Sequence, residues 1–238
     1  MSVTLKKKPV MHEYSFSDKN INCVYVQKDL GIFTDSKLTF VHYVSHLVKK
    51  GNRMTCLEFH NFHSCKNEQL LRTIYCTLIR PNLEYCTVVF NSILKSQSDR
   101  LERVQRRFLF FMFRSLLGTD RVSHLNDNPN YLQLCHLFNL PTLYDRRIVN
   151  DCVFLYKHTN NCYNLTDANP FSLHVPQCCT KSAANHIVHI PWSRVEATKQ
   201  GFVSSISSTY NLQPTTDAVF VLNCIKSCGH HDCIYIYP

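Results

Sequence analysis

The stretch SDRLERVQRRFLFFMFRSLL, residues 98–117, decides the fold, because it holds the clearest amphipathic helix of the chain. Its apolar and neutral side chains recur every three or four positions, so a helix gathers them along one direction. These residues are Leu101, Val104, Gln105, Phe108, Met112 and Leu116. Gly118 follows, and glycine commonly ends a helix because it tolerates a left-handed backbone. We therefore expect a buried central helix here.

The same stretch carries arginines along one edge of the predicted helix. Four of them project within about 60° of one another, whereas Arg106 points elsewhere. They are Arg100, Arg103, Arg107 and Arg114. Guanidinium groups spaced in this way can contact successive backbone phosphates, which suits their bidentate hydrogen bonding. A helix buried on one side also needs a solvated side, and arginines serve that purpose without a ligand. The sequence is compatible with both interpretations.

A second amphipathic pattern spans residues 40–62, upstream of the central helix. Its apolar residues fall on one face, and Lys49, Lys50 and Arg53 fall on the opposite face. We interpret these three residues as a second phosphate contact, although a charged solvated face explains them equally well.

Helix-capping signals predict the remaining helices. Asn67 can cap a helix that runs until Pro81 ends or bends it. Residues 131–138 have a helical pattern, and Thr142 with Asp145 fits a capping box that opens a helix toward residue 158. Beyond residue 160 the periodicity fades into a stretch rich in Asn, Pro, Ser and Thr.

The N-terminal part has β-forming patterns. Residues 12–16 and 21–27 flank the turn-forming cluster Ser-Asp-Lys-Asn at 17–20, which predicts a β-hairpin. Gly31 follows and permits a bulge or a close approach of the backbone. We therefore expect an α+β chain that is mostly helical.

Composition narrows the possible partners. The chain has 238 residues, 45% of them hydrophobic, and can bury a core. Its 26 Lys and Arg against 17 Asp and Glu give a net charge of +9, which favours polyanions such as nucleic acid or anionic membrane. No stretch reaches the roughly 18 to 20 apolar residues of a spanning helix, and no secretion signal begins the chain. We expect an intracellular protein, nuclear or cytoplasmic, with no membrane partner.

Four blocks of sequence follow one another in a familiar order. They are KDLGIFTDSKLTF at 28–40, IRPNLEYC at 79–86, LERVQRRF at 101–108 and LPTLYDRR at 140–147. Together they resemble the region after the catalytic site of jockey-like non-LTR retrotransposon reverse transcriptases. The resemblance covers roughly residues 3 to 215 and is clearest over the first 160. In that family the first block forms the primer-grip turn, here Leu30, Gly31 and Ile32; an ordinary strand-to-loop transition is the alternative.

The resemblance implies RNA-directed DNA synthesis, in which palm carboxylates hold two divalent ions, Mg²⁺ in the complete enzyme. That chemistry needs a Tyr-x-Asp-Asp-like box, and the sequence contains no Asp-Asp pair. Asp29 and Asp35 belong to the grip turn, and we assign them no catalytic role. We expect no cofactor in this fragment, which would begin after the catalytic motifs.

The resemblance therefore predicts a thumb and post-thumb fragment that binds the backbone of an RNA–DNA hybrid, of RNA or of DNA, without catalysis of its own. The missing palm and fingers are a further expected partner. The fragment could come from a truncated element or from a complete polymerase whose remainder lies upstream. A helical protein-interaction module is the alternative, binding through Phe108, Phe110, Phe111 and Phe113.

Cysteine and histidine crowd the C-terminal end. Zinc prefers thiolate and imidazole ligands, and the candidates are Cys224, Cys228, His231 and Cys233. Four ligands so close in sequence would strain a tetrahedral site, so we expect no metal there. The alternative is a short tail that forms a strand or frays.

The sequence predicts four regions. Residues 1–40 form a palm-edge hairpin and primer-grip-like turn, and residues 41–118 form a thumb-like helical bundle. Residues 119–160 form a smaller C-terminal helical unit, and residues 161–238 form a loosely ordered region with the Cys/His tail.

Overall fold

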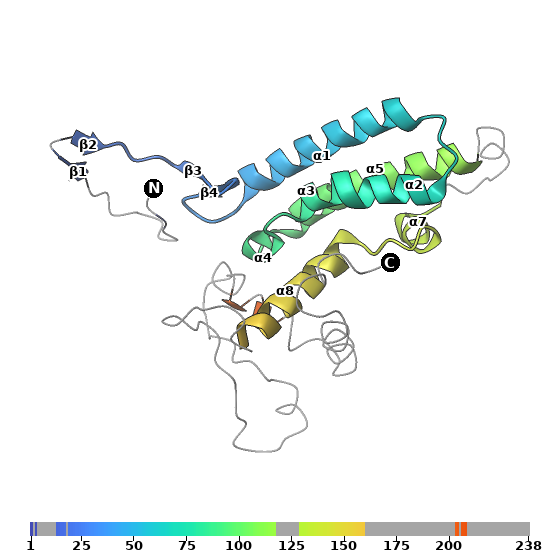
Figure 1. Ribbon diagram of the computed structural model, residues 1–238. Coiled ribbons are helices and arrows are strands. Elements are labelled where there is room, and N and C mark those ends of the chain that lie inside the picture. The colour runs from blue at the N-terminus through green and yellow to red at the C-terminus, as the bar shows by residue number, and fades with distance from the viewer. Residues whose placement is uncertain are drawn as a thin grey trace, which may run out of the picture.

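The computed structural model describes residues 1, 3, 13–17, 19–117, 129–159, 203–204 and 206–208. Within these residues two small hairpins precede a body of helices (Figure 1). The predicted α+β, mostly helical class is confirmed.

The N-terminal strands pair as two separate hairpins. Strand β1 (Tyr14–Phe16) pairs antiparallel with β2 (Lys19–Ile21), and β3 (Val26–Asp29) pairs antiparallel with β4 (Ile32–Asp35). The predicted hairpin forms, but its second strand is 19–21 and not 21–27, because residues 26–29 pair in a second hairpin that the sequence analysis did not predict. The reason is the turn after β3, where two successive residues have positive φ, as a tight two-residue hairpin turn requires.

Asp35 joins the second hairpin to the first helix, α1 (Val41–Phe62). Its Oδ1 accepts hydrogen bonds from the backbone N–H groups of Thr39 at 2.9 Å and Phe40 at 3.0 Å. Its Oδ2 accepts the Thr39 hydroxyl at 3.0 Å. A carboxylate before a helix also meets the positive end of the helix dipole. Asp35 therefore has a structural role where the chain turns into α1.

A nearly continuous helical stretch follows. Asn67 caps α2 (Glu68–Ile74), accepting the Leu70 N–H at 3.1 Å, as the sequence predicted. The π-helical segment η1 (Tyr75–Ile79) and α3 (Arg80–Glu84), with Pro81 in its first turn, come next. A proline ring presses on the carbonyl four residues earlier, and the wider π turn provides room for it. Helix α4 (Thr87–Phe90) ends the stretch.

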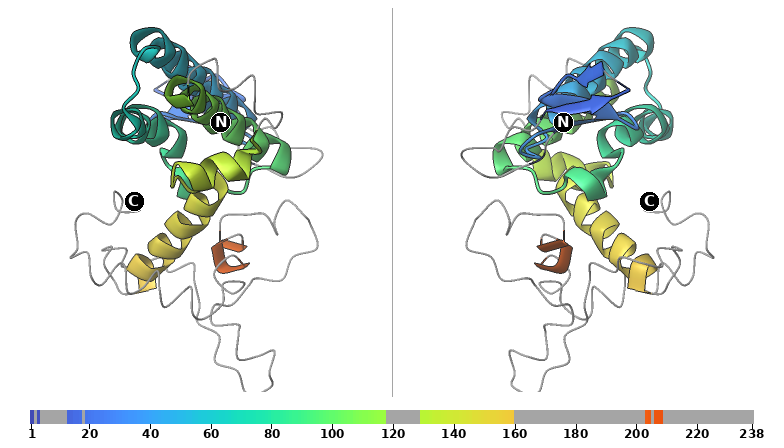
Figure 2. Two further views of the ribbon diagram at one scale, coloured as in Figure 1. Left: turned by 90° about the vertical axis from the view of Figure 1, so that its right-hand side faces the viewer. Right: turned by 90° about the vertical axis from the view of Figure 1, so that its left-hand side faces the viewer.

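The predicted central helix is present as α5 (Lys95–Leu117), and it contacts helices on several sides. Helix α1 lies alongside it (Figure 1), α2 also contacts it, and α7 (Tyr131–Leu137) and α8 (Leu143–Thr159) pack on it as well. Figure 2 shows α8 diverging from the other helices in both views. Six α5 side chains are at most 1% exposed: Leu101, Val104, Gln105, Phe108, Leu109 and Met112.

A shared hydrophobic core joins helices from both predicted helical units. Leu134 of α7 and Leu143 of α8 belong to the same buried cluster as residues of α1, η1 and α5. A smaller cluster forms where Leu155 of α8 meets Ile206. Residues 119–128, between the two predicted units, lie outside the described residues.

Helices α1 and α5 approach each other closely at Gly51. A Cβ atom on Gly51 would lie 2.8 Å from Cδ2 of Leu83 and 3.1 Å from Cγ1 of Val104. Both neighbouring side chains are buried in the core and have little room to move. The spacing of these helices therefore depends on the absence of a side chain at position 51.

The side-chain amide of Gln105 is buried in the core and links several elements. Its Oε1 accepts the Tyr75 hydroxyl at 2.6 Å, and its Nε2 donates to the Pro141 carbonyl at 2.9 Å and to Sγ of Cys135 at 3.7 Å. The amide thus uses its acceptor and both donor directions without water, and it ties α5 to η1, to α7 and to the loop before α8.

Glu102, one turn before Gln105, holds the start of α8. Its carboxylate accepts the backbone N–H groups of Leu143 at 3.2 Å and Tyr144 at 2.7 Å, and also the Tyr131 hydroxyl. Thr142 adds the predicted cap by accepting the Asp145 N–H at 3.1 Å. The backbone N–H groups in the first turn of α8 therefore find some of their hydrogen-bond acceptors on a different helix, α5.

We predict that Gly51→Val lowers the free energy of unfolding by about 1 to 3 kcal/mol, because the new methyl groups overpack the contact with Leu83 and Val104. Urea unfolding of the full chain measures the change. Cys56→Val, at an exposed position of the same helix, is the control. An equal effect of both substitutions would contradict the prediction.

We predict that Gln105→Leu destabilises the chain by about 2 to 4 kcal/mol, since the Tyr75 hydroxyl and the Pro141 carbonyl lose their partner. Tyr75→Phe removes one of these stranded groups, so the double variant should lose less than the sum of the two single variants. Urea unfolding of all three variants gives the coupling. Simple additivity would show that the network is not cooperative.

Candidate nucleic-acid interface

The arginines of α5 lie on the side opposite its buried residues. Leu101 and Phe108 are fully buried, whereas Arg103, Arg107 and Arg114 are exposed. This follows from the apolar repeat, because side chains three or four positions apart share a face of a helix.

Most of these arginines line one open hollow beside α5. This hollow, the basic hollow, has a volume of about 450 Å³. Its lining residues are Phe59, Arg103, Arg106, Arg107, Phe110, Phe111 and Arg114. Of the four predicted arginines, Arg103, Arg107 and Arg114 are in this set, and Arg100 is not.

Arg106 is a correction to the sequence analysis, which expected it to point elsewhere. It lines the basic hollow, and its guanidinium carbon lies 5.4 Å from the centre of the Phe110 ring, a cation–π distance. Helical periodicity fixes the direction of Cβ, but a long side chain can still carry its charge around the helix. The basic hollow therefore contains four guanidinium groups.

Two of these arginines donate hydrogen bonds to neutral groups among the described residues. Arg107 Nη1 donates to Oδ1 of Asn52 in α1 at 2.9 Å, and Arg103 Nε donates to the Asp99 carbonyl at 3.3 Å. In the part of the chain that the structure describes, Arg146 forms an ion pair with Glu84, and this pair lies outside the hollow. The positive charge of the hollow is therefore not neutralised by any ion pair among the described residues.

The second predicted phosphate contact lies on α1. Lys49, Lys50 and Arg53 are exposed there, but they do not line the basic hollow. Asn52, which precedes Arg53, accepts the hydrogen bond from Arg107 and so brings this part of α1 against α5. Sequence reasoning missed Asn52 because no periodic pattern links residues so far apart in the chain.

Phenylalanines line the hollow between the arginines. Phe59 of α1 stacks on Phe111 of α5, with ring centres 4.2 Å apart and planes inclined by 26°. The sequence placed Phe59 on the apolar face of its helix, but it carried no signal that pairs Phe59 with Phe111. Phe110 and Phe111 are only half-buried.

The protein-interaction surface predicted from four phenylalanines of α5 is not formed as expected. Phe108 is 0% exposed and Phe113 is 8% exposed, so both belong to the core. The reason is that α5 is enclosed by α1 and α2 as well as by α7 and α8, which bury more than one side of it.

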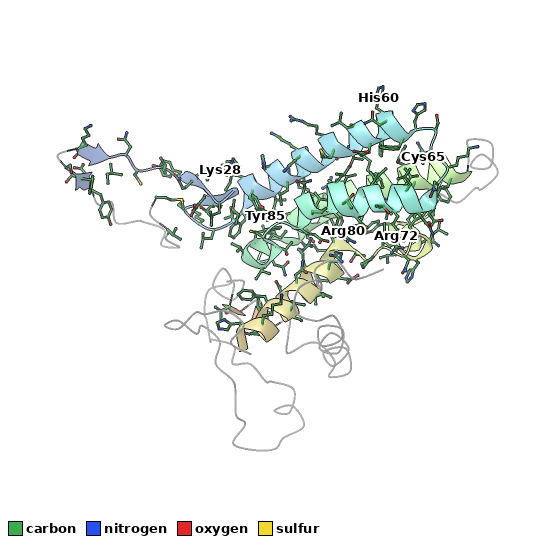
Figure 3. All side chains as sticks on the ribbon, in the orientation of Figure 1. Lys28, His60, Cys65, Arg72, Arg80 and Tyr85 are labelled. Carbon is green, nitrogen blue, oxygen red and sulfur yellow. The ribbon has the colours of Figure 1, made fainter. Side chains whose placement is uncertain are left out.

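The predicted primer-grip residues form the tip of the β3–β4 hairpin. Leu30 has φ 46° and is 83% exposed, and Gly31 has φ 87°. Ile32, by contrast, is 8% exposed and joins the core. The Tyr85 hydroxyl, after α3, donates to the Leu30 carbonyl at 2.9 Å and fixes the tip against the helices (Figure 3). An αL residue that is not glycine is unusual, and this contact helps to hold Leu30 there.

The residues described contain no group of three or more His, Cys, Asp or Glu side chains that could hold a metal ion. The Cys224, Cys228, His231 and Cys233 candidate lies outside the described residues. The Asp35 carboxylate accepts hydrogen bonds from Thr39 and Phe40 at the start of α1.

A larger cleft of about 1160 Å³ lies where α5 meets α7 and α8. Arg103 and Arg106 line both this cleft and the basic hollow, so the two are neighbours across α5. The cleft also contains Glu102, whose carboxylate caps α8 and holds Tyr131.

A buried polar cluster lies between α4 and α8. Asp151 is 0% exposed, and its Oδ2 accepts a hydrogen bond from Asn91, while its Oδ1 has no hydrogen-bond partner among the described residues. Burial raises the pKa of Asp151 to about 7, against the opposing effects of Asn91 and the charge of Arg147. Arg147 is 2% exposed and donates to the Ser98 hydroxyl.

Among the described helices, none combines the length and the apolar composition needed to cross a bilayer.

No protein-family model matches this chain, and no match was found among the curated proteins or the solved structures.

We predict that the stability of the chain falls between about pH 4 and pH 7, because Asp151 binds its proton more tightly in the folded than in the unfolded state. This contribution is present in full below pH 4 and is lost as the pH rises through 7. It amounts to at most about 4 kcal/mol.

Asp151→Asn should remove this part of the pH dependence, which urea unfolding at pH 5 and pH 8 measures. Asp99→Asn, at an exposed position of α5, is the control and should keep the original slope. An unchanged slope in Asp151→Asn would contradict the assignment.

Proposed function

We propose that this chain binds the sugar–phosphate backbone of nucleic acid, an RNA–DNA hybrid above all, through the basic hollow. In this proposal it corresponds to the thumb and post-thumb region of a non-LTR retrotransposon reverse transcriptase and does not polymerise by itself. The observation that carries the proposal is a hollow lined by four arginines, none of which forms an ion pair with an acidic side chain among the residues that the structure describes.

Electrostatics supports this proposal. Arginines that lie close together at the edge of a helix repel one another unless an anion lies between them, and phosphate fits the fork of a guanidinium group. The net charge of +9 adds long-range attraction for a polyanion. Contacts of this type give affinity and register without reading base sequence.

The four sequence blocks that carry the family resemblance contact one another in the structure. Tyr85 of the second block bonds to Leu30 of the first, and Glu84 of the second pairs with Arg146 of the fourth. The third block reaches the fourth through the Gln105 and Glu102 contacts already described. The residues that carry the resemblance therefore belong to one packed unit, which the proposal treats as the thumb-like body.

Absence of catalysis by the chain alone is part of the proposal. Two-metal phosphoryl transfer requires carboxylates that converge on the ions. The sequence contains no Asp-Asp pair, and the Asp35 carboxylate is already occupied by three hydrogen bonds.

We predict that Arg103→Glu with Arg107→Glu weakens binding to a labelled RNA–DNA hybrid at least tenfold at 0.1 M salt, since two phosphate contacts become repulsive. The slope of log affinity against log salt should decrease by about 2. Fluorescence anisotropy of the full chain across a salt series measures both quantities.

Lys19→Glu with Lys37→Glu is the matched control, because it makes the same change of charge at exposed positions outside the hollow. If both double variants lost affinity equally, net charge alone would explain binding. If neither lost affinity, the arginines would be only a solvated face.

A further inference from the structure

The basic hollow contains aromatic side chains that binding of phosphate does not require. Phosphates require only the arginines, yet Phe59, Phe110 and Phe111 line the same hollow. Phe110 and Phe111 are half-buried, so part of each ring surface faces the space between the guanidinium groups. Interleaved aromatic and cationic side chains are the chemistry by which proteins hold unpaired bases.

We infer that the basic hollow binds an unpaired stretch of nucleic acid, with a base stacked at Phe110 and Arg106 and flanking phosphates on Arg103, Arg107 and Arg114. The inference rests on the proposed function and names the form of nucleic acid that this site prefers.

Phe110 is better placed for this role than the other phenylalanines. Phe111 is already stacked on Phe59. Phe110 instead has the Arg106 guanidinium over its ring at 5.4 Å, so a planar cation and an aromatic ring lie together at the hollow. A nucleobase can stack on either of these planar groups, because every base has a π face irrespective of its identity.

The lining of the hollow extends far enough along α5 for more than one contact. Arg103 and Arg114 are separated by about 16 Å along the helix axis at 1.5 Å per residue. Phe110 lies between them, so a flexible strand can place phosphates on both sides of a stacked base. In a duplex the base faces are covered by their neighbours, and a blunt hybrid would use the arginines but leave Phe110 unused.

The test uses the full chain and three probes with the same hybrid duplex. The first probe is blunt, the second carries an unpaired oligothymidine extension, and the third carries an extension of equal length and charge made of abasic residues. Fluorescence anisotropy measures the affinity for each probe. We expect the thymidine extension to bind at least about fivefold more tightly than the abasic extension, in line with stacking of one base.

Phe110→Leu should abolish this difference between the thymidine and abasic extensions, because leucine keeps the apolar contact but offers no ring. Phe16→Leu, in β1 at a position that is 76% exposed, is the matched aromatic control and should keep the difference. Thermal unfolding checks that both variants fold.

The outcomes separate this inference from the proposed function. Salt-dependent binding that is equal for the thymidine and abasic extensions would overturn the stacked base and leave the backbone contact standing. An absence of salt-dependent binding to any probe would overturn both. If Phe110→Leu failed to fold, the comparison of the two extensions with the unchanged chain would still decide.

Discussion

The arrangement of the helices depends on two polar side chains that α5 places at the hydrophobic core. Gln105 is 0% exposed, and its amide is satisfied only when η1, α7 and the loop before α8 all lie in their observed places. Apolar packing tolerates small shifts. Burying an amide without hydrogen-bond partners, by contrast, destabilises the folded state by several kcal/mol. Glu102 adds a charged cap for α8 from the same turn of α5. These two residues thereby select one packing of the helices from many with similar apolar burial.

This packing also determines which side chains of α5 face the surface. With Gln105 held inward, α5 cannot rotate, so Arg103 and Arg107 must face outward. Gly51 then allows α1 to lie close enough for Asn52 to reach Arg107 and for Phe59 to reach Phe111. The basic hollow is therefore a consequence of core geometry, and its charges are positioned by groups that never contact a ligand.

Sequence reasoning recovered what local periodicity and capping determine. The central helix, the Asn67 and Thr142 caps and the outward direction of Arg103 all follow from neighbours a few residues away. It failed where the outcome depends on distant parts of the chain. The β3–β4 hairpin, the reach of Arg106 over Phe110 and the stacking of Phe59 on Phe111 each depend on tertiary contacts or on a flexible side chain. The burial of Phe113 was missed because amphipathic patterns assume one buried side, whereas α5 has partners on several.

The two hairpins differ in how they are attached. The β3–β4 hairpin is held by Ile32 in the core and by the Tyr85 and Asp35 contacts, whereas every described residue of β1 and β2 is exposed. A segment without buried side chains contributes little to cooperative unfolding. The β1–β2 hairpin is therefore a natural place for insertion, deletion or fusion, because its described strand residues could be replaced without repacking the core.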